Sequence, residues 1–260
     1  MTASTTPPEK VNDGFQPMPG SALRGYLMVI PAILYVAIYL LLLLLFALLI
    51  PPFVRKFEIP LIRGWGRGPL ILFGIKIEVH GEEIRDTPGA KLLLFNHVNI
   101  FDLLVLAATW TKGSTIIYKQ EFHKIPVMGR LMRFFRMISV DRSNHEKAVQ
   151  SLNLAAQLIT EKGYIVVMAP EGTRSTTGKL AAFKKGPFHL AIQTGVPIVP
   201  MVQRGSEKLS PGGTLIARSG RVRIDYLPAI PTVDWNRKQL STHTHQVREQ
   251  FLKYLEDGSN

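Results

Sequence analysis

The stretch Asn96-His97-Val98-Asn99-Ile100-Phe101-Asp102 lies between two apolar runs, and the rest of the chain can be interpreted from it. The run before it, residues 91–95, is short and bounded by turn signals, which is typical of a buried strand, whereas the run after it favours a helix. Positions five apart in one helix point about 140° away from each other. His97 and Asp102 can therefore meet only if His97 lies on the turn, outside the helix. An imidazole with a carboxylate behind it is the base-and-orienter pair of a catalytic triad.

This pair alone is weak evidence, because a single histidine near a helix start is more often a capping or solvated residue. A second stretch, Glu171-Gly172-Thr173-Arg174, also follows an apolar run, at residues 164–168. Two charged stretches that each follow a predicted buried strand favour a site over an isolated surface histidine.

The two stretches together resemble the glycerolipid acyltransferases, which esterify glycerol phosphates and lysophospholipids. That family carries Asn-His-x4-Asp and, later, Glu-Gly-Thr-Arg. Two further family blocks match at residues 138–142 (Ile-Ser-Val-Asp-Arg) and 196–200 (Val-Pro-Ile-Val-Pro). The resemblance extends over about residues 75–230 and is closest to 1-acylglycerol-3-phosphate acyltransferase. The residues between His97 and Asp102 do not identify one subclass.

Length, net charge and the absence of cysteine limit the classes of protein to which this chain can belong. A length of 260 residues predicts one domain with an appendage. The net charge of +12 and the pI of 10.0 indicate polyanionic partners, namely nucleic acid, anionic lipid or a phosphorylated substrate. The absence of cysteine excludes disulfides and metal sites built on cysteine.

The N-terminal part predicts a membrane-inserted segment. Residues 26–54 contain no charged side chain, and the 19 residues from 32 to 50 contain no helix breaker. As a helix they would be about 28 Å long, close to the thickness of bilayer hydrocarbon. The apolar part is too long for a secretory signal peptide, and the leucines at 41–45 leave no polar face for a helix buried in a globular domain. We expect insertion into the inner or plasma membrane, or an equivalent one.

The flanks of this segment complete the predicted organisation. Residues 1–25 are expected to be a flexible tail. Residues 53–73 mix aromatic and aliphatic side chains with cations, which is typical of an amphipathic segment in the membrane interface. Residues 55–67 carry a net charge of +3, so a spanning helix would place the following domain, and its active site, in the cytoplasm. In the family, an N-terminal helical pair can instead enter one leaflet without crossing, and both dispositions stay open.

Residues 74–260 predict an α/β domain. Strands are expected at 75–80, 91–95, 114–118, 138–140, 164–168, 196–201 and 221–227, with helices at 127–136, 143–163, 187–194 and 238–256. This alternation favours a mainly parallel or mixed sheet flanked by helices. His97, Arg142 and Glu171 each follow a predicted strand, and sites in such sheets gather at the carboxyl ends of the strands.

His97 is the candidate general base and Asp102 its orienting partner. A histidine with an ordinary pKa near 6.5 can remove the proton of an attacking hydroxyl at neutral pH. The hydroxyl of the acceptor would replace the triad serine, and the chain has no Gly-x-Ser-x-Gly motif. No third metal ligand is suggested nearby. We therefore predict no metal and no bound cofactor, with acyl-CoA or acyl-acyl carrier protein as co-substrate.

The remaining candidates would bind the acceptor. The resemblance assigns this role to the Arg of Asp-Arg and to the Glu-Gly-Thr-Arg block, and a forked guanidinium suits phosphate. Singly, each arginine is more often a surface charge. The candidates are Arg142, Glu171, Gly172, Thr173 and Arg174, with Lys119 and Lys184 as weaker choices for phosphate or oxyanion contact.

Two classes of function compete. The leading one is a membrane-bound enzyme that acylates the 2-hydroxyl of lysophosphatidic acid, or of another lysolipid, and so forms phosphatidic acid or its analogue. The other is a basic, membrane-anchored binding protein without catalysis. No nucleic-acid-binding module is recognisable, so we expect no nucleic acid partner. The basic residues of 112–147, which have a net charge of +5, are expected to face anionic headgroups.

Overall fold

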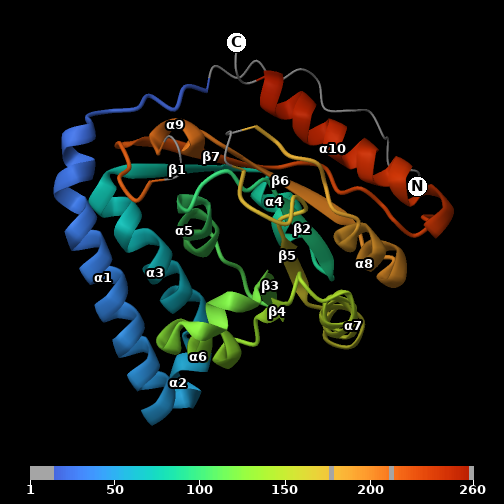
Figure 1. Cartoon of the computed structure of the whole chain (residues 1–260), viewed down its shortest axis with the longest axis horizontal. Helices are drawn as coiled ribbons and strands as arrows, with labels where there is room; N and C mark the ends of the chain where they lie inside the picture. Colours follow the sequence, from blue (N-terminus) through green and yellow to red (C-terminus); the bar gives the residue numbers. More distant parts are fainter. Residues whose placement is uncertain (1–14, 176–178, 211–213, 258–260) are drawn as a thin grey trace.

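The computed structural model describes residues 15–175, 179–210 and 214–257. Its centre is a seven-stranded sheet of order β1-β7-β6-β2-β5-β3-β4 (Figure 1). The strands are β1 (Ile75–His80), β2 (Lys91–Phe95), β3 (Ser114–Lys119), β4 (Ile138–Val140), β5 (Ile165–Met168), β6 (Ile198–Arg204) and β7 (Gly220–Tyr226). From β6 to β4 all neighbours are parallel, whereas β7 runs antiparallel to β6. The predicted α/β fold with a mainly parallel, mixed sheet is confirmed.

Helices cover both faces of the sheet, which explains why every residue of β2 is buried. Leu93 and Phe95 point to the face covered by α3 (Glu58–Phe73) and α5 (Phe101–Ala108). Leu92 and Leu94 point to the opposite face. That second face packs against α7 (His145–Lys162), α8 (Gly186–Thr194) and α10 (Leu240–Asp257). The remaining elements are α1 (Ala22–Leu49), α2 (Pro51–Lys56), α4 (Glu82–Asp86), α6 (Pro126–Phe134), α9 (Ser206–Leu209) and the 3-10 helices η1 (Gln120–Lys124) and η3 (Arg237–Gln239).

Most of the predicted membrane segment, residues 26–49, forms the long helix α1, which lies along one side of the domain (Figure 1), and its last residues begin α2. Among the described residues, α1 is the one helix long and apolar enough to cross a membrane. It begins at Ala22, so the predicted tail over residues 1–25 is too long. Residues 1–14 of that tail lie outside the described residues. The segment before α1 contacts the sheet, because Arg221 N donates to Pro17 O (2.9 Å) and Gly20 N donates to Ser219 O (2.7 Å).

The segment predicted to lie in the membrane interface is packed instead between α1 and α5. The hydroxyl of Tyr35 in α1 donates to Gly64 O (3.0 Å), and that of Tyr39 donates to Leu61 O (2.8 Å). A Cβ added at Gly66 would lie 2.4 Å from Leu104 O, so only glycine allows α5 to approach this closely. The interfacial interpretation of residues 53–73 stays a prediction, and the large hydrophobic side chains left exposed for such a contact are Phe53, Phe57 and Ile71.

Candidate active site

His97 and Asp102 meet beyond the carboxyl end of β2. His97 lies on the loop that follows the strand, and Asp102 lies in the first turn of α5. His97 Nδ1 is 3.1 Å from Asp102 Oδ2, so the contact predicted from their spacing is present. Because Nδ1 faces the carboxylate, Nε2 is the ring nitrogen left for a substrate, and the imidazole side chain keeps 16% of its exposure.

Asp102 is completely buried and is surrounded by donors. Besides His97, its Oδ2 accepts hydrogen bonds from Val98 N (2.7 Å) and Asn99 N (2.6 Å). Its Oδ1 accepts one from Ser206 Oγ (2.6 Å) at the start of α9. A carboxylate with donors on both oxygens cannot rotate freely, so the imidazole beside it is held in one orientation.

Glu171 is buried and binds the main chain of His97. Its carboxylate, 1% exposed, accepts hydrogen bonds from His97 N and Ala181 N, both at 2.8 Å. Ser175 N in turn donates to His97 O (2.7 Å). Burial raises the pKa of Glu171, and the two backbone donors oppose this shift. In this structure both oxygens of Glu171 are used by backbone donors, which favours a role in positioning His97 over the predicted acceptor contact.

The rest of the Glu-Gly-Thr-Arg block forms an exposed turn after β5. Gly172 has a φ of +74°, in the left-handed region that glycine favours. Thr173 and Arg174 are exposed. Lys184 lies over this turn, because its backbone N donates to Pro170 O (2.7 Å) and its Cγ would be 3.1 Å from a Cβ at Gly172. Thr173, Arg174 and Lys184 therefore share the surface next to the His97 loop.

Lys119 and Arg142 lie at the same edge of the sheet but further from His97. Lys119 is the last residue of β3 and Arg142 follows β4, and these strands are the second and third neighbours of β2 on the side of β5. At about 4.8 Å per strand, their backbones are displaced from β2 by about 10 and 14 Å. Arg142 is exposed, and Lys119 Nζ pairs with Glu121 Oε1 at 2.8 Å. The predicted common edge is thus present, and Arg174 lies in the turn after β5, a direct neighbour of β2.

Several polar residues of the site were missed by sequence reasoning. Asn96 joins β2 to β6, since its Nδ2 donates to Gln203 O (2.8 Å) and its Oδ1 accepts from Gln203 N (2.7 Å). Asn99 Nδ2 donates to Ser206 O (2.9 Å). The two asparagines belong to the stretch that carries His97, so their polarity next to an apolar strand was an available signal. Ser206 lies 104 positions after Asp102, and nothing in its local sequence indicates the contact.

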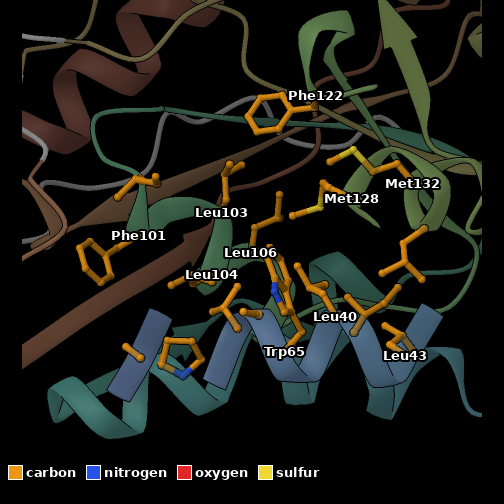
Figure 2. A pocket seen from close by; sticks show the side chains of 18 of the residues that line it. Leu40, Leu43, Trp65, Phe101, Leu103, Leu104, Leu106, Phe122, Met128 and Met132 are labelled. Carbon is orange, nitrogen blue, oxygen red and sulfur yellow. The ribbon is translucent and has the colours of Figure 1, made fainter. Parts of the chain in front are cut away.

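A cavity of about 460 Å³ opens beside α5, between this helix, α1, α3 and α6. Its lining is almost wholly apolar, and it includes Ile100, at the end of the loop that carries His97, and Phe101, the first residue of α5. Figure 2 shows Leu40, Leu43 and Trp65 on one side of the cavity, with Met128 and Met132 on the other. Over the described residues, no cluster of three or more His, Asp or Glu side chains could hold a metal ion.

Comparisons with known proteins identify relatives. A family model described as Acyltransferase matches residues 76–204. A 1-acyl-sn-glycerol-3-phosphate acyltransferase of Limnanthes alba is 35% identical over 184 residues, which are 71% of this chain and 65% of the plant protein. The enzyme of that name from Salmonella typhimurium is 29% identical over 189 residues, 71% of this chain and 76% of the bacterial protein.

A solved structure shows the same fold. It is the crystal structure of the 1-acyl-sn-glycerophosphate acyltransferase of Thermotoga maritima, with a TM-score of 0.70 and 23% sequence identity. The similarity covers 90% of this chain and 95% of the Thermotoga chain. It therefore includes parts of the chain outside the family match.

Proposed function

Because this chain belongs to the acyltransferase family, we propose that it transfers a fatty acyl group from a thioester donor to the sn-2 hydroxyl of 1-acylglycerol 3-phosphate, which gives phosphatidic acid. The observation that carries the proposal is the His97–Asp102 hydrogen bond at the edge of the sheet where Arg174 is also exposed. A base and a cation at one edge suit an acceptor that has a hydroxyl and a phosphate.

The chemistry follows from the orientation of the imidazole. His97 Nε2 takes the proton of the acceptor hydroxyl as its oxygen attacks the thioester carbonyl. The tetrahedral intermediate then breaks its C–S bond, and the imidazolium returns the proton to the leaving thiolate. Asp102 keeps Nδ1 protonated and stabilises the positive charge that forms on the ring.

Transfer is proposed to be direct, without an acyl-enzyme. The chain has no cysteine. The serine closest to the catalytic pair, Ser206, is 1% exposed and uses its hydroxyl to donate to Asp102. It therefore cannot act as a nucleophile while it holds that contact. The acceptor hydroxyl supplies the nucleophile instead.

The apolar cavity is the proposed site of the acyl chain. Its lining supplies almost no polar partner, so it favours an aliphatic chain over a headgroup. Ile100 and Phe101 connect it to the loop of the base. The phosphopantetheine or nucleotide part of the donor would stay outside it, so the cavity does not distinguish acyl-CoA from acyl carrier protein.

The proposed location is the membrane, where acceptor and product reside, with the active site on the cytoplasmic side. Leu34, Ile38, Leu41 and Leu45 of α1 are all exposed at 46% or more, which is unfavourable in water. Arg130, Arg133 and Arg136 are exposed on or just after α6, which packs against α1. Such cations beside an apolar surface suit a bilayer with anionic headgroups.

The test is an assay of the purified protein with acyl-CoA and acyl carrier protein donors and lysolipids that differ in headgroup. We expect turnover with lysophosphatidate and loss of activity when its phosphate is absent. Preference for another lysolipid would keep the mechanism and change the acceptor. Absence of turnover with every pair, together with lipid or nucleic acid binding, would favour a binding protein without catalysis.

A further inference from the structure

The Oδ1 atom of Asp102 accepts a hydrogen bond from the hydroxyl of Ser206. Ser206 lies after β6, whereas His97 and Asp102 lie after β2. Three of the donors around Asp102 come from residues 97–99 and all reach Oδ2. The hydroxyl of Ser206 reaches Oδ1 at 2.6 Å. Ser206 is 1% exposed and Asp102 is fully buried, so water has little access to replace this contact.

The backbone around Ser206 is shaped to present this hydroxyl. Gly205 follows the end of β6 with a φ of +99°, and a Cβ there would lie 2.6 Å from Arg221 O. The chain can therefore turn at this point only with glycine. After the turn, Ser206 O accepts a hydrogen bond from Asn99 Nδ2 (2.9 Å). Ser206 is thus held at two points: its carbonyl accepts from Asn99, and its hydroxyl donates to Asp102.

We propose that Ser206 is a positioning residue for the catalytic pair, and that it holds the Asp102 carboxylate in the orientation that directs Oδ2 to His97. This inference rests on the proposed function. A buried carboxylate oxygen that loses its donor is costly, and rotation of the carboxylate toward another donor relieves that cost. Such a rotation moves Oδ2 away from Nδ1, so the imidazole loses its fixed tautomer.

Two further carboxyl groups near Asp102 make the hydrogen bond from Ser206 more important. Glu171 and Glu207 both lie near Asp102, and burial, together with the charge of Asp102, raises the pKa of each. Three carboxyl groups therefore share this region, and each hydrogen bond to one of them offsets part of their mutual repulsion. Glu207 accepts from Gly205 N (2.9 Å), so its carboxylate is tied to the same turn.

The kinetic test compares Ser206→Ala with Ser210→Ala. Ser210 is equally buried, and its hydroxyl donates to Thr214 O, away from Asp102. Loss of a hydrogen bond to a charged group predicts a fall in kcat of about 10-fold for Ser206→Ala, with KM for both substrates unchanged. In an Asp102→Asn background the same change should cost less than about twofold, because the carboxylate is already gone. A kcat of Ser206→Ala equal to that of Ser210→Ala, or an equal loss in both backgrounds, overturns the proposal.

A second measurement needs no substrate and so separates this inference from the proposed activity. Nitrogen NMR of ¹⁵N-histidine protein, at a pH where histidine is neutral, should show His97 protonated at Nδ1 in the wild type and in Ser210→Ala. Ser206→Ala should show a mixture of the two tautomers. Unchanged His97 signals in Ser206→Ala overturn the positioning role, whereas a wild type without turnover on any lysolipid overturns the proposed function and leaves this measurement valid.

Discussion

At the scale of single residues, the proposed mechanism depends on Nε2 of His97. Replacement of His97 by Ala removes the proposed base, and we expect kcat to fall by about 10²–10⁴-fold. Asp102→Asn should also lose activity, because an amide nitrogen facing Nδ1 favours the wrong tautomer. Initial rates and circular dichroism check this. His145→Ala, an exposed histidine at the start of α7, is the matched control. Near-normal turnover of His97→Ala would refute the mechanism.

Recognition of the phosphate should depend more on Arg174 than on Arg142. Arg174 follows β5, the neighbour of β2, whereas Arg142 follows β4 at about 14 Å from β2. We expect Arg174→Ala to raise KM for lysophosphatidate more than Arg142→Ala does, with KM for the donor little changed. Arg174→Lys should recover only part, because a point charge cannot make a forked contact.

The comparison for these variants is Arg237→Ala, an exposed arginine in η3. Unchanged kinetics of both Arg→Ala enzymes would remove these two residues from the acceptor site. A larger effect of Arg142 would place the phosphate beyond β3, near the outer edge of the sheet.

The sequence could predict some contacts of the site and not others. His97 and Asp102 are five positions apart, and helix geometry alone limits how they can meet. The partners of Glu171 are backbone N–H groups, which carry no sequence signal. Ser206 reaches Asp102 only because β6 is the other neighbour of β2 in the sheet. Strand order is a property of the whole fold, so this contact could not be derived from local patterns.

At the scale of elements, α1 is a wall of the cavity as well as an anchor. Ala37 lines the cavity, and Ala37→Phe should fill part of it. If the cavity holds the acyl chain, turnover with long-chain donors should fall more than turnover with short-chain donors. Leu41→Phe is the control, because Leu41 is 60% exposed and belongs to the outer surface of α1. An equal effect on all chain lengths would place the acyl chain elsewhere.

The packing of α3 could have been predicted from its glycines. A mixture of cations and apolar residues fits both an interfacial helix and a packed one, so composition could not distinguish these two arrangements of α3. Gly64, Gly66 and Gly68 lie close together, and in the structure they allow the close approach of Tyr39, α5 and Tyr35 respectively. Small residues at such spacing are a signal of close helix packing. The contact of residues 15–20 with β7 had no comparable signal.

Gly66 gives a test of how tightly α3 packs on α5. In Gly66→Ala the new Cβ would lie 2.4 Å from Leu104 O and 2.5 Å from Ala108 N, both backbone atoms. The helix must shift, so we expect destabilisation of about 1–3 kcal/mol despite the better helix propensity of alanine. Gly186→Ala is the control, since the nearest atom there is a leucine methyl at 3.7 Å. Thermal unfolding in detergent measures both. A Gly66→Ala protein as stable as the control would contradict the close packing of α3 on α5.

At the scale of the whole molecule, the contacts of α1 favour one of the two membrane dispositions. With 28 residues α1 is about 42 Å long, enough to span. However, α3 runs antiparallel beside it, as the Tyr35–Gly64 and Tyr39–Leu61 contacts show. Arg63 and Arg67 therefore lie level with the middle of α1, where a spanning helix would place them at the bilayer centre. Charged side chains there are costly.

The N-terminal end of α1 leads to the same conclusion. Pro17 and Gly20 are hydrogen-bonded to Arg221 and Ser219, so the start of α1 must lie on the same side of the membrane as the α/β domain. The far end continues through α2 into α3, and α6 also contacts α1. Crossing would require these contacts to break. We therefore expect α1 to lie in one leaflet with its exposed apolar residues in the hydrocarbon, and we expect both of its ends to stay on one side of the membrane.

The absence of cysteine makes this disposition measurable. In a Met18→Cys/Lys253→Cys protein the two thiols report the start of α1 and the exposed side of α10. In sealed vesicles, an impermeant maleimide reaches only thiols on the outside. If both thiols of each molecule face the same side, mass spectrometry should show molecules with two labels and molecules with none. Spanning would give singly labelled molecules, whichever way the protein inserts. Labelling in detergent, which should modify both thiols, is the control. The outcome also bears on catalysis, because a helix confined to one leaflet keeps the cavity at the depth of acyl chains and His97 near the level of headgroups.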